Sequence, residues 1–274
     1  MTQIEERVEV ARVPRPNYAR KVFTDAEIAA GKHRTFIGGH WDTHGQHQLD
    51  FRVAQGLQPG DKFLDVGCGA LRAGRHLVDY LEPGNYYGID ANRSLIQAGY
   101  DVELTDEQRA KLPIANLRAN ERFDGDFAVP FDMAIAQSVF THVSLNHMRL
   151  CLLRLAKVMR PGAKFYATFN EQPWSTSVDK VIERDGRHPH FSEQNVFWYY
   201  RADLKWAGSF GPWRYRYIGN WDHPGGQKMV EYTRLKGSVP SAAPSVTTSR
   251  TTIAKARRFA GRGLRAAARR VDPS

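Results

Sequence analysis

Two glycines and an acidic residue lie where an apolar segment meets a turn, and their order indicates a binding site. Residues 63–69 have the sequence FLDVGCG, in which Asp65 precedes Gly67 and Gly69. Glycine adopts positive φ angles without strain and lets a ligand approach the backbone closely. A carboxylate at Asp65 fits poorly beside a pyrophosphate and favours a ligand with a positively charged amino group. The turn is therefore a candidate site for a cationic cofactor.

A second acidic residue, Asp90, ends the next apolar segment, YYGID at 86–90, and follows Gly69 by 21 residues. That interval is about one strand–helix–strand step, so both residues are expected at the same edge of a sheet. An acidic side chain at this position can accept hydrogen bonds from both hydroxyls of a ribose. The alternative interpretation is a helix N-cap, and one carboxylate can fill both roles.

A nicotinamide dinucleotide is the main competing ligand for such a turn. Its fingerprint requires a third glycine three residues after the second. Arg72 occupies that position, and the next glycine, Gly74, comes two residues later. The spacing therefore disfavours dinucleotide binding.

These side chains need strands and helices that bring them together, and hydrophobic periodicity predicts an alternation of the two. The elements expected up to residue 169 are strands at 62–66, 85–90, 115–119, 131–136 and 163–169 and helices at 71–81, 93–111 and 145–159. Beyond them we expect a helix at 192–207 that begins at Ser192, then a closing antiparallel pair of strands at 213–218 and 228–235. Strands separated by helices imply an α/β fold with a doubly wound, mostly parallel sheet.

Four segments in this order resemble the class I S-adenosylmethionine-dependent methyltransferase family, and the resemblance covers residues 40–235. The segments are 63–69, 86–90, 131–143 and 152–163. The resemblance implies a Rossmann-like, seven-stranded sheet with an antiparallel last strand. It also implies S-adenosyl-L-methionine as the cofactor, whose amino group and sulfonium are positively charged.

The resemblance further implies which residues contact the cofactor. They are Asp65, Gly67, Cys68, Gly69, Asp90, Ala91, Gln137 and Ser138. The residues of the glycine turn would hold the methionine part, Asp90 the ribose, and the last two the far wall of the pocket. Asn120 stands where the family more often has an acidic partner for the adenine amino group.

Methyl transfer from a sulfonium is an in-line displacement whose leaving group needs no protonation. The enzyme must align the nucleophile and, for a hydroxyl, remove its proton. Histidine suits this role because its pKa lies near neutrality. His142, just past the strand at 131–136, is the first candidate base, although it could instead only pack over the cofactor. His223, in the sequence WDHP, is the second candidate and Glu171 the third.

Three histidines, His40, His44 and His47, fall on one face if their segment is helical. Three imidazoles so placed could ligate a metal ion. No cysteine or paired carboxylate completes a known ligand spacing, so we predict no metal site. We favour a cap over the cofactor and the acceptor, with Trp41 and Gln46 facing inward.

The composition is that of a soluble globular protein, with 42% hydrophobic and 25% charged residues in 274. No apolar run approaches the roughly 18 residues of a membrane-spanning helix, and the first residues contain no secretory signal. The two cysteines, Cys68 and Cys151, do not make a disulfide framework, which favours the cytoplasm. We see no local base that would make Cys68 a nucleophile.

The net charge of +10 is concentrated at the C-terminus. Residues 250–274 contain eight Lys and Arg against one Asp, a net +7 that leaves +3 for the rest. We therefore predict four parts, namely an N-terminal extension at 1–37, a methyltransferase domain at 38–235, a linker at 236–250 and a basic amphipathic tail at 251–274. An apolar face opposite arginines over 251–271 fits weak contact with an anionic inner membrane surface, and disorder or nucleic-acid affinity are the alternatives.

Together these features predict an enzyme that methylates an oxygen of a small-molecule, saccharide or glycolipid acceptor. Residues 136–139 are AQSV, unlike the asparagine-proline-proline-tyrosine type motif of enzymes that methylate nucleic-acid nitrogens, which disfavours a nucleic-acid acceptor. Two alternatives remain, an RNA-modifying methyltransferase that uses the Arg-rich tail and a non-catalytic cofactor-binding protein. The acceptor, the methylated atom and the oligomeric state are left open.

Overall fold

The computed structural model describes residues 17–184 and 188–239. The predicted tail at 251–274 and most of the predicted linker lie outside these residues, and the four-part division of the chain stays a prediction. Within the described residues, no helix combines the length and the apolar character needed to cross a membrane.

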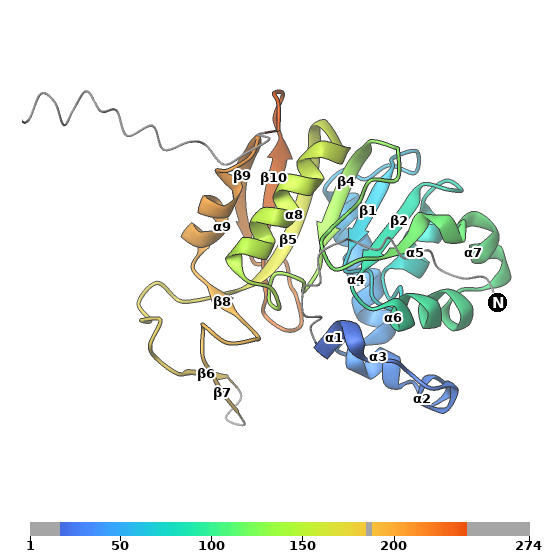
Figure 1. Cartoon of the computed structure of the whole chain (residues 1–274), viewed down its shortest axis with the longest axis horizontal. Coiled ribbons are helices and arrows are strands. Elements are labelled where there is room, and N and C mark those ends of the chain that lie inside the picture. Colours follow the sequence, from blue (N-terminus) through green and yellow to red (C-terminus); the bar gives the residue numbers. More distant parts are fainter. Residues whose placement is uncertain (1–16, 185–187, 240–274) are drawn as a thin grey trace, which may run out of the picture. The chain divides into compact units, whose positions relative to one another are not determined.

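A mixed sheet of eight strands forms the centre of the domain (Figure 1). Along the sheet the order is β3-β2-β1-β4-β5-β10-β9, and β8 pairs with the end of β5. The strands are β1 Phe63–Val66, β2 Tyr86–Asp90, β3 Leu117–Ala119, β4 Phe131–Ala136, β5 Met159–Glu171, β8 Trp198–Tyr199, β9 Trp213–Gly219 and β10 Lys228–Arg234. The strands β1 to β5 are parallel, whereas β10 is antiparallel to both β5 and β9. The predicted fold class is confirmed, because β8 only extends a seven-stranded Rossmann-like sheet.

Helices cover both faces of this sheet, and each face has its own hydrophobic core. The helices are α1 Asn17–Arg20, α2 Asp25–Ala29, α3 Lys32–Phe36, α4 Trp41–Ala54, α5 Gly74–Tyr80, α6 Arg93–Ala98, α7 Asp106–Lys111, α8 Leu145–Val158 and α9 Arg201–Gly208. Leu64 of β1 packs with Leu152 of α8 and Leu204 of α9 in one core. Phe63, the neighbour of Leu64, packs with Leu77 of α5 in the other. Side chains alternate between the faces of a strand, so the same strands supply both cores.

Two of the predicted helices differ from the observed ones. The predicted helix at 93–111 is divided into α6, a π-helical turn at Gly99–Glu103 and α7. Thr105 causes the division, because its hydroxyl accepts the backbone N–H of Gln108 while the Gln108 side chain accepts the backbone N–H of Thr105. This capping box begins a new helix at residue 106.

The predicted helix at 192–207 is wrong over its first half. Ser192 does not cap a helix, and its hydroxyl instead donates to the carbonyl of Val178. Trp198 and Tyr199 pair with the end of β5, and α9 begins only at Arg201. The backbone groups at the tip of β5 need partners, and an extended segment supplies them where a helix could not.

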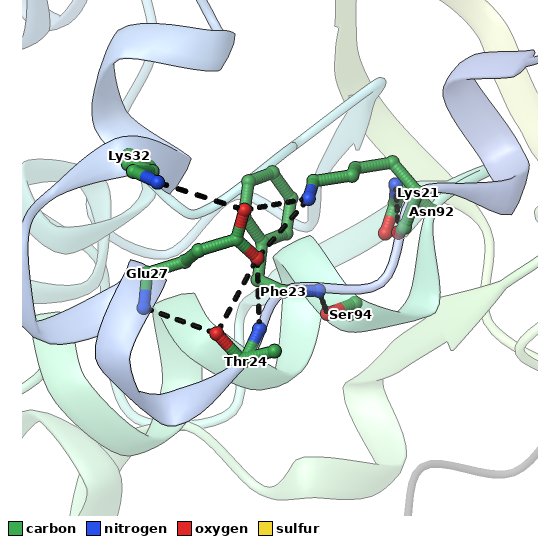
Figure 2. Close-up of polar contacts among 7 residues, drawn as sticks. All are labelled: Lys21, Phe23, Thr24, Glu27, Lys32, Asn92 and Ser94. Atoms are coloured by element: carbon green, nitrogen blue, oxygen red, sulfur yellow. Dashed lines mark hydrogen bonds and ion pairs between the residues drawn. The ribbon is translucent and has the colours of Figure 1, made fainter.

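The N-terminal helices are fixed to the region around α6 (Figure 2). The backbone N–H of Phe23 donates to Oγ of Ser94 at 3.0 Å, and Nδ2 of Asn92 donates to the carbonyl of Lys21 at 2.9 Å. Thr24 and Glu27 form a capping box for α2, and Glu27 also pairs with Lys21. These contacts place α1 beside the end of β2.

Candidate cofactor and acceptor site

The glycine turn follows β1, and the backbone N–H groups of Gly67 and Cys68 donate to the carbonyl of Ile89 at 2.7 and 3.1 Å. Both Gly67 and Gly69 have positive φ angles, of 81° and 53°. A Cβ at Gly67 would lie 2.3 Å from Cγ2 of Val139, a contact that no side chain could accept. Only glycine therefore fits at residue 67, where the strand ends and the backbone becomes available to a ligand.

Asp90 at the end of β2 holds the glycine turn in place. Its Oδ2 accepts the backbone N–H of Gly69 at 2.9 Å, and its Oδ1 accepts the backbone N–H of Asn92 at 2.7 Å. The hydroxyl of Tyr18 also donates to Oδ2, at 3.3 Å. Burial raises the pKa of Asp90 to about 6, although these hydrogen bonds oppose the shift. The helix N-cap interpretation of Asp90 is wrong, because Asn92 is the N-cap of α6 and its side chain accepts the backbone N–H of Leu95. The contact of the Asp90 carboxylate with ribose hydroxyls stays a prediction.

Asp65 belongs to a buried charged group on the face of the sheet that α4 and α5 cover. Its Oδ2 accepts the hydroxyl of Tyr86 at 3.0 Å. Burial raises the pKa of Asp65, while the nearby guanidinium groups of Arg52 and Arg72 oppose the shift. Arg52 is completely buried, and its Nε and Nη2 have no hydrogen-bond partner among the described residues. Asp65 thus already faces two guanidinium groups, and its direct contact with a cofactor stays a prediction.

Ser138 connects the end of β4 to the two neighbouring strands β5 and β10. Its backbone N–H donates to Oγ1 of Thr168 at 2.7 Å, and its hydroxyl donates to Oε1 of Gln227 at 3.1 Å. The Thr168 hydroxyl donates to the same Oε1 at 2.7 Å. Ser138 has a φ of 58°, which is rare outside glycine and is typical of functional sites. The Gln137 side chain lies beside it, and within residues 17–184 and 188–239 its buried Oε1 has no hydrogen-bond partner.

His142 lies in the loop between β4 and α8, as the sequence predicts. Its Nδ1 is 2.9 Å from Oδ1 of Asn195, which precedes β8. Because the amide oxygen can only accept, Nδ1 carries the proton and Nε2 is left as the basic nitrogen. Desolvation lowers the pKa of His142, although the hydrogen bond to Asn195 opposes this. The imidazole is thus neutral and oriented, as a general base requires.

His223 forms an aromatic cluster with two histidines of α4. Its ring centroid lies 4.8 Å from that of His44, and Trp221 stacks on His47 at 4.9 Å. The Nδ1 of His223 accepts the backbone N–H of Gly225 at 2.9 Å. Burial lowers the pKa of His44 to about 3, so its imidazole stays neutral at neutral pH.

The cap over the cofactor and the acceptor stays a prediction. Trp41 is buried, whereas Gln46 is exposed and donates to Oδ1 of Asp50. The prediction that Gln46 faces inward is wrong, because five residues along a helix carry it to the opposite side. In the part of the chain that the structure describes, no group of three histidine, cysteine or acidic side chains could hold a metal ion.

A cavity of about 950 Å³ opens at the carboxyl end of β5. Its walls come from the segment 170–174, from β8, from α9 and from the loop between β9 and β10. Glu171 lines it and is held at both oxygens, because Arg201 donates to Oε1 at 2.9 Å and the Tyr217 hydroxyl donates to Oε2 at 2.6 Å. Neither His142 nor His223 is among its lining residues. Of the tryptophans after β5, Trp174 and Trp198 line the cavity.

Several residues of this site carry no signal in the sequence. Tyr18 precedes its partner Asp90 by 72 residues, and Gln227 follows Ser138 by 89. Arg52 is a charged residue in a helix and gives no sign that it is completely buried. Asn120, expected near an adenine, has its amide occupied by its own loop, through two hydrogen bonds with the backbone of Asp124.

Comparison with known proteins agrees with this geometry. Residues 64–165 match a family model described as a methyltransferase domain. Among solved structures, DesVI from Streptomyces venezuelae superimposes with a TM-score of 0.53 at 15% identity, over 78% of this chain and 99% of DesVI. A S-adenosylmethionine-dependent methyltransferase from Clostridium acetobutylicum gives a TM-score of 0.53 at 12% identity, over 78% of this chain and all of that chain.

A third similar structure contains a ligand. It is CalS10 from Micromonospora echinaspora, an amino pentose methyltransferase with S-adenosylmethionine bound, which gives a TM-score of 0.52 at 15% identity over 78% of this chain and 99% of CalS10. At these identities the likeness concerns the fold, and the family model concerns the half of the sheet that contains the glycine turn, Asp90 and Ser138.

Proposed function

We propose that this chain transfers the methyl group of S-adenosylmethionine to a hydroxyl of a small-molecule or saccharide acceptor, as a class I S-adenosylmethionine-dependent methyltransferase. The observation that carries the proposal is the cavity at the end of β5, which lies next to the strand tips of the cofactor site. Aromatic and polar side chains line it together, as in pockets for sugars and other hydroxylated rings. One similar structure is an amino pentose methyltransferase, which fits an acceptor of this size.

The residues of the glycine turn and the end of β2 would bind the cofactor. S-Adenosylmethionine supplies the methyl group on a sulfonium. The carboxylate of Asp90 accepts the ribose hydroxyls, and the backbone of Gly67, Cys68 and Gly69 faces the methionine part. Ala91 and Gln137 would complete the pocket, and Ser138 is held at its far wall by Gln227.

His142 would act as the general base. Its Nδ1 is occupied by Asn195, so Nε2 is the nitrogen that can take the proton of the acceptor hydroxyl. A base with a lowered pKa is neutral at the pH of the cytoplasm and is ready to accept a proton. His223 is the alternative base; it belongs to the β9–β10 loop, and its ring lies beside that of His44.

The test compares His142→Ala with His147→Ala, a second histidine of the same region that lies in the first turn of α8. A cell extract with radiolabelled S-adenosylmethionine supplies the acceptors. Removal of a general base lowers the turnover by roughly 10²–10⁴-fold, whereas the affinity for S-adenosylhomocysteine, measured by calorimetry, should stay unchanged. We expect label in a small-molecule or carbohydrate fraction and full activity of His147→Ala.

Three outcomes contradict the proposal in different parts. Full activity of His142→Ala contradicts the assignment of His142 as the general base, and a loss of activity in His223→Ala alone would assign that role to His223. Label that enters RNA removes the acceptor class. Tight binding of S-adenosylhomocysteine with no label in any fraction would instead indicate a cofactor-binding protein without catalysis.

A further inference from the structure

We propose that the acceptor carries an anionic group, a carboxylate or a phosphate, which Lys205 and Lys228 bind in the cavity at the end of β5. This inference rests on the proposed function, because it assigns the cavity to the acceptor. It adds the chemical class of the acceptor, a hydroxylated ring compound with a negatively charged substituent.

The charges in the cavity do not balance. Among the residues that the structure describes, one carboxylate, Glu171, and three cationic side chains, Arg201, Lys205 and Lys228, line it. Arg201 is neutralised by its ion pair with Glu171, in which two guanidinium nitrogens contact the same carboxylate oxygen at 2.9 Å. Its guanidinium also lies 3.8 Å from the ring centroid of Tyr217, which fixes its position. The negative charge of Glu171 is therefore balanced by Arg201 and does not neutralise the two lysines.

The two lysines have no ionic partner in the part of the chain that the structure describes. Within residues 17–184 and 188–239, neither ammonium group forms an ion pair or a hydrogen bond. The exposed Lys205 comes from α9 and the half-buried Lys228 begins β10, so the two lining lysines belong to separate elements. Two like charges in a concave wall attract anions from solution, and an ammonium group binds carboxylate or phosphate oxygens through charge-assisted hydrogen bonds.

The remaining walls suit a ring. Trp174, Trp198, Tyr200 and Tyr215 line the cavity. Trp174 is 84% exposed although it is a large apolar side chain, and its ring meets that of Tyr200 edge to face at 5.8 Å. Aromatic faces of this kind pack against sugar rings or planar rings. Glu171 keeps acceptor positions beyond its bonds to Arg201 and Tyr217, and these can receive a hydroxyl of the ring.

The cationic side of the cavity adjoins the cofactor site. Lys228 directly follows Gln227, whose Oε1 accepts the hydroxyls of Ser138 and Thr168. Gly225 and Gly226 of the same loop line the cavity. An anion bound at Lys228 would therefore anchor the acceptor next to the strand tips where the methyl group is expected.

Three matched probes test the charge preference. They are 4-nitrophenyl β-glucoside, 4-nitrophenyl β-glucuronide and 4-nitrophenyl β-glucoside 6-phosphate, which share both rings and differ in charge. Their binding to the full chain, saturated with S-adenosylhomocysteine, is measured by quenching of tryptophan fluorescence, since Trp174 and Trp198 line the cavity. We expect at least one anionic probe to bind about 10-fold more tightly than the glucoside, with a preference that falls as salt is added.

The variants separate charge from fold. The double variant Lys205→Ala, Lys228→Ala should lose the preference, whereas Lys205→Arg, Lys228→Arg should keep it. Lys157→Ala, on the exposed side of α8, is the matched control and should behave like the parent chain. The relative affinity of the carboxylate and phosphate probes shows which anion the site prefers.

Equal affinity for the neutral and anionic probes overturns the inference, and so does a preference that survives in the double alanine variant. Either result leaves the proposed function intact if neutral saccharides become labelled from S-adenosylmethionine. Conversely, the proposed function fails if no hydroxyl acceptor is labelled, even where the anionic probes bind through the two lysines.

Discussion

The proposed cofactor side and the proposed acceptor side of this molecule, called the cofactor side and the acceptor side below, are built in different ways. The cofactor side consists of the tips of β1 and β2, and its central hydrogen bond, from Gly69 to Asp90, joins residues 21 positions apart. On the acceptor side, Glu171 binds the hydroxyl of Tyr217, 46 positions away. One strand–helix–strand unit suffices for the first, whereas the second needs β5, β8, α9 and the β9–β10 loop in place together. The cofactor side is therefore expected to tolerate changes in the acceptor side, and the substitutions below test this independence.

The largest effect is expected for Asp90→Asn. The substitution removes the negative charge and one acceptor while it keeps the shape, so the charge-assisted bonds to ribose hydroxyls are lost. At about 1.5 kcal/mol or more for each of two bonds, the affinity for S-adenosylhomocysteine falls by about 100-fold. Calorimetry measures it, and Asp101→Asn, whose exposed carboxylate contacts Gln97, is the control. Binding of the nitrophenyl probes should be unchanged, and a parallel loss there would contradict the independence of the two sides.

Gly67→Ala should lower the stability of the fold as well as cofactor binding. A positive φ costs an alanine about 1 kcal/mol, and the clash with Val139 adds about 1 kcal/mol or more. Gly84→Ala is the matched control, because Gly84 has a φ of 79° with nothing within 4 Å of a Cβ. Urea unfolding should therefore show a loss of about 2 kcal/mol for Gly67→Ala and about half of that for Gly84→Ala.

A second substitution separates the two contributions at Gly67. Val139→Ala removes the methyl groups that the new Cβ would meet, so in the Gly67→Ala background it should recover part of the lost stability. No recovery would mean that the strained backbone, and not the contact with Val139, excludes other residues from this turn.

The same contrast decides how far the sequence predicts the structure. The order of strands, the glycine turn and the position of Asp90 follow from local periodicity and from spacing, because each depends on residues within one strand–helix–strand unit. The segment at 192–199, which ends in β8, does not follow from a local pattern. Trp198 and Tyr199 lie within the predicted helix at 192–207, yet they pair as a strand with Asn170 and Glu171 at the tip of β5. Gln227 and Tyr18 depend on contacts across 59 to 89 positions, which no local pattern encodes. The cavity depends on contacts of Glu171 across 30 and 46 positions.

The pH dependence of cofactor binding gives a smaller effect that belongs to Asp90. Since burial raises its pKa to about 6, the folded chain holds a proton there at pH 5 that the unfolded chain has lost. Stability from this group therefore falls as pH rises from about 4 to 6. The ribose needs the ionised form, so the affinity for S-adenosylhomocysteine should rise about 10-fold between pH 5 and pH 8.

Calorimetry across this range measures the rise, and Asp90→Asn should flatten it. Tyr18→Phe sharpens the assignment, because the Tyr18 hydroxyl donates to the carboxylate and helps to keep its pKa down. Without that hydroxyl, the midpoint should move to higher pH. A rise that persists in Asp90→Asn would assign the titration to Asp65, whose pKa burial also raises.

The smallest effect is expected at Gln227, which with Ser138 and Thr168 forms the seam between the two sides. Gln227→Ala removes the oxygen that accepts the hydroxyls of Ser138 and Thr168, at a cost of about 1 kcal/mol. Because Ser138 is proposed to face the cofactor and Lys228 lines the cavity proposed for the acceptor, both affinities should fall by about 5-fold. Asn220→Ala, in the same loop and in contact with Asp222, should change neither.

A double-mutant cycle then decides whether the seam couples the two sides. Asp90→Asn combined with Lys205→Ala should change the affinity for S-adenosylhomocysteine, and likewise that for the anionic probes, by the sum of the two single changes in binding free energy. No residue is shared between the contacts of Asp90 and Lys205. Gln227→Ala combined with Ser138→Ala should not be additive, since each removes the same hydrogen bond. If the first pair also departs from additivity, the acceptor cavity is organised by the bound cofactor, and the two sides of the sheet form one site rather than two.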